Sequence, residues 1–466
     1  MSTHNNVKKI NPKDLLVPER LDIIVKYLYI QALESRQDND FFNKLYINHI
    51  LKRTGGKQYI YQYIDGKPYQ SHSKEGIDRY LDDFLLMIES FKKSGFQKEY
   101  FIPVSSQNGI ILDGAHRASC CIYFNIEPIV LYEPRLGRKW DYKWFLENDF
   151  EQEEINIIVE TFCKIKKENV FACILWAPLK EYWDDIQEII TKSYKIIYVK
   201  DFKINNSNFD ELVYDIYSQE FGVDIPKKIT NKINLLKEYN TDLRLIFFYI
   251  DEPEYIQMNQ RDMCLQVIKQ KEKIRDNWNS IIEKEKFITL HTSDNSEHTQ
   301  HITSIFLSQN NLAHLNLRKA THYRKELFNW LCEYENVLKH YGISKNDCCI
   351  VGSGPLEIVG IREATDIDFI LHSTIREKLF DEKSRSLSEN VDIVHKGYHE
   401  YNNPSLPISD DEIITNNKNH FLFRGLKFAN IKIIRERKNN HQRDKDVEDV
   451  YMIDEFFRKN KIDRGV

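Results

Sequence analysis

Three aspartates near the end of the chain have the residue type and spacing of a metal-dependent catalytic site. Asp366 and Asp368 stand two residues apart in the apolar segment "TDIDFIL". Residues at this spacing on a β-strand point to the same side, where two carboxylates repel each other unless a cation lies between them. Asp392, in the later apolar segment "ENVDIVH", can supply a third carboxylate from a neighbouring strand. We therefore predict that the three aspartates bind Mg²⁺ or Mn²⁺ beside a reacting phosphate, with Asp392 near the attacking oxygen.

A glycine turn precedes these aspartates. The segment "CCIVGSG" predicts a strand that ends at Gly352 and Ser353, and the following "PLEIVGI" predicts a helix. Glycine allows the backbone to approach a ligand closely, and the N–H groups at the start of a helix attract anions. We expect Gly352 and Ser353 to bind the phosphates of a nucleoside triphosphate. The alternative is an ordinary tight turn followed by a strand with solvated aspartates.

The order of these motifs resembles the polymerase-beta-like nucleotidyltransferase superfamily, over about residues 345–455. The Gly-Ser turn, the D-x-D pair and the later aspartate match the family pattern in order. The resemblance implies that basic residues further along, Lys427 and Lys438 among them, lie near the nucleotide phosphates. The Arg-Gly that usually follows the turn is missing from its typical position, although Arg362 could substitute.

A second motif for binding phosphate lies in "IILDGAHRASCCIYF". Asp113 and Gly114 predict a turn, and His116 and Arg117 then fall in the first turn of a helix, where the helix dipole and the guanidinium favour an anion. The segment resembles the DGxHR motif of the ParB and sulfiredoxin-like family, over about residues 70–135. That resemblance implies a phosphate-binding role for Asp113, Gly114 and Arg117 and a catalytic role for His116, as in small-molecule kinases of the family. Ala115 stands where sulfiredoxin has its cysteine, and the alternative is an ion pair between Asp113 and the two basic residues.

The middle region contains a run of histidines and hydroxyl residues between 287 and 316. We expect residue 292, 293 or 294 to cap the helix that follows. In the alternative, His291 and Asp294 line a substrate pocket that Arg275 could join. His291, His298 and His301 lack the i, i+4 spacing of a helical metal site, since His298 and His301 stand three residues apart with no acidic residue between them, so their spacing does not predict a metal site.

The elements around these motifs predict an α/β (α+β) multidomain chain. We expect a ParB/sulfiredoxin-like domain over 1–150, an α/β domain of unknown role over 151–320, and a nucleotidyltransferase-like domain over 321–466. Apolar periodicity and turn residues predict the main helices and strands. The expected helices are 18–35, 73–96 with Ser73 as its N-cap, 115–124, 181–194, 208–221, 262–285 and 324–342; the expected strands include 101–104, 169–178 and 242–253.

Composition excludes several classes of protein. The 466 residues carry a formal net charge of -5, so there is no overall basic field, and specific nucleic-acid binding is not expected. The eight cysteines form no C-x-x-C pair of the kind found in zinc ribbons. We found no apolar run of about 18 residues and no signal-peptide pattern, so we predict a cytoplasmic protein without a membrane span.

Two regions that handle phosphate suggest successive steps on one small molecule. The leading hypothesis is a bifunctional enzyme that phosphorylates a hydroxyl of a sugar, polyol or amino alcohol and then joins that phosphate to a nucleotide. Because the middle region resembles segments of proteins from capsule loci, the product is expected to serve surface-polysaccharide biosynthesis. The alternatives are a toxin-like nucleotidyltransferase that modifies a protein or RNA, and a non-catalytic ParB-like protein that binds nucleotide or DNA.

Overall fold

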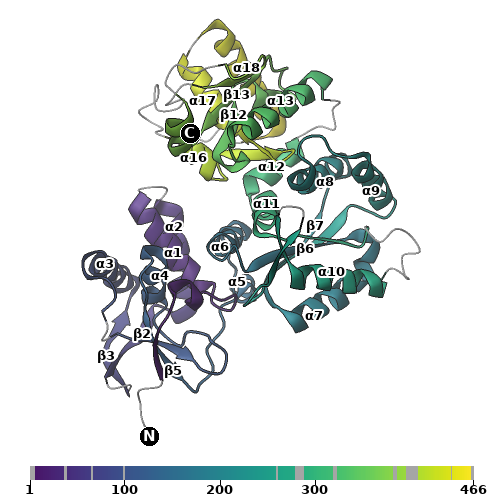
Figure 1. Ribbon diagram of the computed structural model, residues 1–466. Helices are drawn as coiled ribbons and strands as arrows, with labels where there is room; N and C mark the ends of the chain where they lie inside the picture. Colours follow the sequence, from purple (N-terminus) through teal and green to yellow (C-terminus); the bar gives the residue numbers. More distant parts are fainter. Residues whose placement is uncertain are drawn as a thin grey trace. The chain divides into compact units, whose positions relative to one another are not determined.

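The structure is a computed structural model that describes residues 6–35, 39–64, 67–97, 100–258, 261–278, 288–317, 323–380, 386–394, 408–441 and 443–462 (Figure 1). It combines helices with several small sheets, which confirms the prediction of a mixed α/β chain. The chain divides into two compact units. The first comprises Met1–Phe171, Glu188–Val199 and Ile246–Pro253, and the second Ala172–Gln187, Lys200–Leu245 and Glu254–Val466. Among the described residues, no helix is long and apolar enough to cross a membrane.

The N-terminal elements surround a three-stranded sheet in which β5 lies between β1 and β4. Strand β1 is antiparallel to β5, and β4 is parallel to it. Strand β4 and helix α4 confirm the predicted strand and the helix expected after Gly114. The elements before residue 166 are β1 (Val7–Lys9), the 3₁₀-helix η2 (Pro12–Leu15), α1 (Asp22–Ser35), α2 (Asn39–Thr54), β2 (Lys57–Ile64), β3 (Lys67–Glu75), α3 (Ile77–Ser94), β4 (Ile102–Ser105), α4 (Ala115–Phe124), β5 (Ile129–Glu133), α5 (Tyr142–Glu147) and α6 (Gln152–Ile165).

A hairpin of β2 and β3, which the sequence analysis missed, lies in this unit. Ser73 pairs with Tyr59 in the hairpin, so the expectation that Ser73 caps the next helix is wrong. Helix α3 begins instead after Gly76, whose φ of 81° is a conformation that glycine adopts without strain.

The middle elements include a four-stranded sheet with the order β11-β6-β8-β7. Strands β6 and β8 and helices α7 and α8 confirm four of the predicted elements. Of the predicted helix 262–285, the structure describes a helix from Leu265 to Trp278; residues 262–264 are part of a strand instead, and residues 279–287 lie outside the described ranges. Strand β7 was not predicted. The middle elements are β6 (Val170–Trp176), the 3₁₀-helix η3 (Ala177–Tyr182), α7 (Trp183–Ser193), β7 (Lys195–Lys203), α8 (Asn206–Phe221), α9 (Lys227–Lys237), β8 (Asp242–Tyr249), β9 (Tyr255–Met258), β10 (Arg261–Cys264), α10 (Leu265–Trp278), β11 (Leu290–Thr292), α11 (Ser296–Phe306) and α12 (Gln309–Leu317).

The C-terminal elements build a five-stranded sheet with the order β14-β13-β12-β16-β15. Strand β13 is antiparallel to β12 and parallel to β14, and β16 is parallel to β12. The elements are α13 (Lys325–Tyr341), the 3₁₀-helix η5 (Lys345–Asp347), β12 (Cys348–Val351), α14 (Gly354–Ile358), β13 (Ile367–Leu371), α15 (Ser373–Leu379), β14 (Val391–Ile393), α16 (Asp410–Thr415), β15 (His420–Phe423), β16 (Leu426–Ala429), α17 (Ile431–His441) and α18 (Asp444–Asn460).

Alternating side chains of the central strands separate the core of this sheet from its polar residues. Ile367 and Phe369 on β13 are fully buried and join one hydrophobic cluster with Leu331 and Tyr334 of α13. Asp368, between the two buried positions, lies on the other side of the strand, where the period of two directs it. Burial of the apolar positions therefore fixes the direction in which the aspartate points.

Candidate functional site

The three predicted carboxylates converge where β13 and β14 begin. Asp368 and Asp392 are direct partners in the parallel register of the two strands, and Asp366 immediately precedes β13. One carboxylate oxygen from each residue lies within 4.8 Å of the others. The structure thus brings together all three residues that were predicted from the sequence to be metal ligands.

The chemistry of this donor set fits a hard divalent cation. All three ligands are carboxylates, the type that Mg²⁺ and Mn²⁺ bind together with phosphate oxygens. Burial, together with the negative charges of Asp366 and Asp392, raises the pKa of the Asp368 carboxyl to about 6. The cluster therefore holds negative charge that a bound cation would neutralise.

Stabilisation of the protein by Mn²⁺ is expected to increase with pH. Because the pKa of Asp368 is raised above its unfolded value, its contribution to stability is present at low pH and is lost as pH rises through about 6. A cation replaces the proton, so the Mn²⁺-induced rise in Tm should be larger at about pH 7.5 than at about pH 5. Thermal unfolding with and without Mn²⁺ measures this difference. An equal rise in Tm at both pH values would contradict a metal bound through Asp368.

The glycine turn lies directly against this cluster. Val351, the last residue of β12, pairs with Asp368 across the sheet, and Gly352 follows with a φ of 67°. A Cβ added to Gly352 would clash with the Asp368 carboxylate and lie 3.1 Å from its Cβ. Ser353 is buried and begins the turn into α14. The predicted turn and the predicted D-x-D pair are therefore in contact.

Gly352→Ala is expected to lower any metal-dependent activity of the aspartate cluster by far more than the strain of its positive φ alone would do. The added methyl group must displace Asp368, whereas the φ of 67° alone costs about 1 kcal/mol. Gly360→Ala is the matched control, because Gly360 has a φ of 73° and a Cβ there meets nothing within 4 Å. We expect a loss of Tm in both variants, larger in Gly352→Ala because of the clash, and a loss of activity of at least about 100-fold in Gly352→Ala alone. Equal activities in the two variants would contradict the close approach to Asp368.

Two buried networks hold the loop between α14 and the aspartates. Glu357 of α14 accepts hydrogen bonds from Arg324 at 2.9 and 2.7 Å and from the backbone N–H of Ala364 at 2.7 Å. Arg362 donates two hydrogen bonds to Asp449 of α18, at 2.5 and 2.8 Å. These contacts fix the segment that leads into Asp366.

The two lysines predicted to lie near phosphate have different surroundings. Lys438 of α17 lies 2.5 Å from Asp449, and its charge partly opposes the rise in the pKa of Asp368 that burial causes. Lys427 donates hydrogen bonds to the carbonyls of Asn346 at 2.7 Å and Ile414 at 2.8 Å. Since Asn346 precedes β12 and the aspartates lie where β12 ends, the structure does not bring Lys427 to the carboxylates.

Arg437 is a candidate site residue that the sequence analysis missed. Burial lowers the pKa of its guanidinium, and the nearby Asp368 carboxylate opposes this shift. Arg435, two residues earlier on the helix, instead donates to Asp454 at 2.6 and 3.0 Å. Arg437 and His441 are four residues apart on α17 and therefore lie on the same face of the helix. This spacing can be read directly from the sequence.

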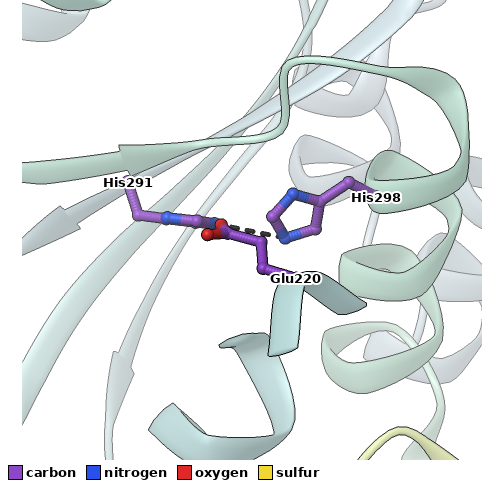
Figure 2. A group of neighbouring side chains, drawn as sticks. All are labelled: Glu220, His291 and His298. Carbon is purple, nitrogen blue, oxygen red and sulfur yellow. Dashed lines mark hydrogen bonds between the residues drawn. The ribbon is translucent and has the colours of Figure 1, made fainter. Parts of the chain in front are cut away.

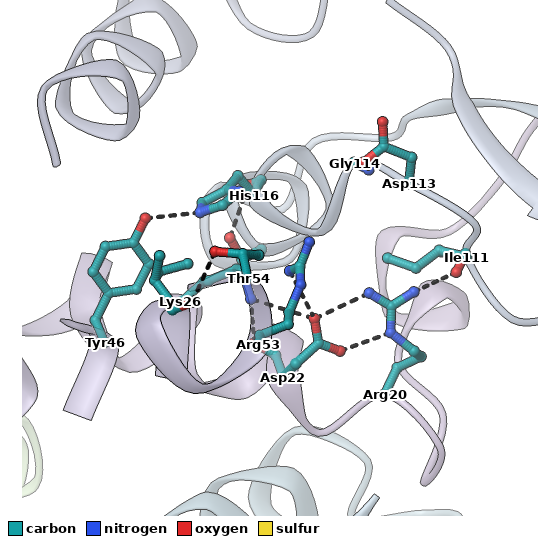
Figure 3. Close-up of polar contacts among 12 residues, drawn as sticks. Arg20, Asp22, Lys26, Tyr46, Arg53, Thr54, Ile111, Asp113, Gly114 and His116 are labelled. Carbon is teal, nitrogen blue, oxygen red and sulfur yellow. Dashed lines mark hydrogen bonds and ion pairs between the residues drawn. The ribbon is translucent and has the colours of Figure 1, made fainter. Parts of the chain in front are cut away.

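The DGxHR residues are placed at the start of α4, as predicted, with partners of their own (Figure 3). The Nε2 atom of His116 lies 2.8 Å from the Tyr46 hydroxyl, and Asp113 accepts a hydrogen bond from the N–H of Gly114 at 2.7 Å. Arg117 donates to the carbonyls of residues 100 and 101, both at 2.9 Å. The guanidinium predicted to hold a phosphate thus also supports the entry to β4.

A buried ionic cluster adjoins this motif (Figure 3). Asp22 accepts hydrogen bonds from Arg20 at 2.7 and 3.0 Å and from Lys26 at 3.3 Å, and the guanidinium of Arg53 lies 3.9 Å away. Burial alone would raise the pKa of Asp22, but these three cations outweigh it and hold the pKa well below the usual range. Arg53 is also close enough to Asp113 to interact with its charge.

The cap of helix α11 differs from the expectation. The side chain of Asn295, rather than residue 292, 293 or 294, accepts the hydrogen bond from the N–H of His298, at 2.8 Å. Asp294 forms an ion pair with Lys271 and accepts a hydrogen bond from Thr292 at 2.6 Å. His291, Asp294 and Arg275 do line one pocket, as the alternative interpretation predicted.

Comparisons with protein-family models, curated proteins and solved structures give no match for this chain.

Proposed function

We propose that the C-terminal region is a metal-dependent nucleotidyltransferase that joins a nucleoside monophosphate to a small-molecule acceptor. The convergence of Asp366, Asp368 and Asp392 beside the Gly352 turn is the observation that carries this proposal. The polymerase-beta-like resemblance agrees with it, because the turn and the carboxylates occur in the family's order. The expected acceptor is the phosphate of a sugar, polyol or amino alcohol, destined for a surface polysaccharide.

The residues around the carboxylates have separate roles in this reaction. Bound Mg²⁺ would neutralise the phosphate charges and the three carboxylates. Ser353 would donate its hydroxyl hydrogen bond to a phosphate oxygen of the triphosphate, and Arg437 would add a positive charge from α17. Asp392 would orient the attacking acceptor oxygen and accept its proton when the acceptor is protonated.

The proposed reaction conserves atoms and charge in a simple way. An oxygen of the acceptor forms a bond to the α-phosphorus of the nucleoside triphosphate, and the bond from that phosphorus to the bridging oxygen of the leaving group breaks. Pyrophosphate leaves with the electron pair of the broken bond. The products are a nucleotide-linked acceptor and pyrophosphate.

Incubation with Mg²⁺ and each labelled nucleoside triphosphate, with and without candidate acceptor phosphates, tests the proposal. Pyrophosphate release that depends on a small acceptor supports it. Label on a protein or RNA would instead support the toxin-like alternative. Tight nucleotide binding without turnover in any combination would support a non-catalytic binding protein and overturn the proposal.

Arg437→Gln is expected to raise KM for the nucleoside triphosphate by about 10-fold or more, because a charge-assisted contact to phosphate is lost. Arg435→Gln, on the same helix, is the matched control, since Arg435 is engaged with Asp454. Initial rates over a range of triphosphate concentrations separate KM from kcat. Equal KM values for the two variants would remove Arg437 from the nucleotide site.

A kinase step in the N-terminal region is a second proposal. The observation that favours it is the buried Arg53, whose guanidinium lies 3.9 Å from Asp22 and interacts with the charge of Asp113, three residues before His116. An anionic phosphate would compensate this charge. Phosphotransfer to an acceptor hydroxyl that survives Asp368→Asn but is lost in His116→Gln would support two separate sites, whereas loss of both activities in either variant would contradict them.

A further inference from the structure

A second cluster of metal-ligand type lies in the middle elements, in a pocket of about 700 Å³ that belongs wholly to the second unit. Its members are His291 of β11, His298 of α11 and Glu220 of α8. One ligand atom from each lies within 4.8 Å of the other two. None of these residues takes part in the proposed nucleotidyl transfer.

The three side chains point toward one another from three different elements (Figure 2). The Nε2 atoms of His291 and His298 are 3.2 Å apart, and both residues are 5% exposed. Glu220 is exposed and approaches them from the end of its helix. Two imidazole nitrogens and one carboxylate oxygen are a common donor set for Zn²⁺ and related divalent transition metals, which leave a further position open to water or substrate.

Neighbouring groups hold the two histidines in place, as hydrogen-bond partners hold the histidine ligands of known metal sites. The His298 ring donates a hydrogen bond to the backbone carbonyl of Ile216, and the backbone N–H of His298 donates to the side chain of Asn295. His291 lies in the paired part of β11, opposite Ile174, and its ring packs 4.7 Å from the Tyr217 ring. Such contacts fix the orientation of the ring and the nitrogen that faces the metal.

The walls of the pocket are rich in positive charge. The lining includes five lysine and arginine side chains and two carboxylates, Glu220 and Asp294, and burial lowers the pKa of one of the five, Lys232, to about 7. Lys232 is 2% exposed and donates to Tyr217 at 2.8 Å, and another of the five, Lys271, pairs with Asp294. If a cation binds Glu220, the remaining field of the pocket favours an anionic ligand.

We propose that Glu220, His291 and His298 bind a divalent transition-metal ion of the Zn²⁺ class, and that this ion and the cationic walls bind a small molecule bearing phosphate or carboxylate. The site is distinct in chemistry from the aspartate cluster, which offers oxygen ligands alone. Excess Mg²⁺ therefore occupies the aspartates without competing strongly for the imidazoles.

Titration of the untagged full chain with Co²⁺ in excess Mg²⁺ tests the metal site. Visible absorption typical of a nitrogen-ligated Co²⁺ is expected at about one equivalent, and Zn²⁺ should displace it. His298→Gln and Glu220→Gln should each weaken Co²⁺ binding by about 10- to 100-fold, whereas His340→Gln, an exposed histidine on α13, should not. Glu220 is exposed, so its variant tests the site even where a change at buried His298 disturbs folding.

Addition of pyrophosphate, and separately of acetate, to the Co²⁺-loaded protein tests the ligand class. A change in the Co²⁺ spectrum with either anion supports an open metal position, and its loss in Lys232→Gln supports the role of the cationic wall. Absence of Co²⁺ binding by the wild type, or equal binding by the wild type and Glu220→Gln, would overturn the metal site. A spectrum that neither anion changes would overturn the ligand proposal.

Discussion

Asp368→Asn is expected to lower the rate of nucleotidyl transfer by at least about 1,000-fold while leaving the metal-free protein as stable as the wild type or more so. Asparagine keeps the size of the side chain but removes the charge at the centre of the three carboxylates. Because burial and the neighbouring aspartates raise the pKa of Asp368 to about 6, loss of this charge relieves repulsion at neutral pH. Steady-state rates and thermal unfolding without divalent cations measure the two effects together.

The combination of these two results makes the test specific. A variant that is merely misfolded loses activity and Tm together, whereas Asp368→Asn should lose activity alone. Asp185→Asn, on the exposed surface of α7, is the control and should change neither quantity. Activity within about 10-fold of the wild type in Asp368→Asn would contradict a catalytic role for the aspartate cluster.

Asp22→Ala is expected to destabilise the N-terminal region by about 3–5 kcal/mol, because it leaves buried cations without their shared carboxylate. Asp22 and Lys26 are fully buried, and Arg20 is 2% exposed. Hydrogen exchange of peptides from α1 measures the local loss of stability without assuming that the whole chain unfolds in one step. Asp82→Ala, at an exposed position of α3, should change the free energy of local opening, as measured by hydrogen exchange, by no more than about 0.5 kcal/mol.

The same carboxylate gives the N-terminal region an acid-sensitive component. The pKa of Asp22 is held well below its usual value, so its contribution to stability is present above the unfolded pKa of about 3.9 and is lost as pH falls through the folded pKa. We expect acid unfolding of the wild type to steepen below about pH 4, and Asp22→Ala to lack this step. Identical acid profiles for the two proteins would contradict the ionic role of Asp22.

The aspartate cluster could be predicted from sequence because its geometry follows from short segments. The i, i+2 spacing of Asp366 and Asp368 sets their common side, and buried Ile367 and Phe369 fix which side faces away from the core. Asp392 carried the same signal, an aspartate between apolar residues. The parallel pairing of β13 with β14 then places Asp392 directly beside Asp368.

The lysine positions could not be predicted in the same way. Lys427 and Lys438 were placed by resemblance, but the direction of a long flexible side chain depends on which carbonyls and carboxylates lie within its reach. Lys427 donates hydrogen bonds to the carbonyls of Asn346 and Ile414, two residues that are distant from it in sequence. Arg437 was missed because the segment contains several basic residues and because Asp368, whose charge acts on Arg437, lies on another element.

The pocket cluster shows a similar limit. His291 and His298 are seven residues apart in a strand and a helix, so the absence of helical i, i+4 spacing wrongly argued against their meeting at one point. Glu220 precedes them by about 70 residues, and only the packing of α8 beside α11 brings it near. The hairpin of β2 and β3 was also missed, although Tyr59, Tyr61 and Tyr63 alternate as strand residues do.

The parallel register of Asp368 with Asp392 has a consequence for how this chain can vary during evolution. The connection leaves β13 after Leu371 and rejoins the sheet at Val391, which pairs with Ile367, so insertions or deletions within the connection need not move either carboxylate. Removing a single residue inside either strand would turn its aspartate into the hydrophobic core. We therefore expect functional descendants of this sequence to differ freely in the length of that connection and to keep the lengths of both strands unchanged.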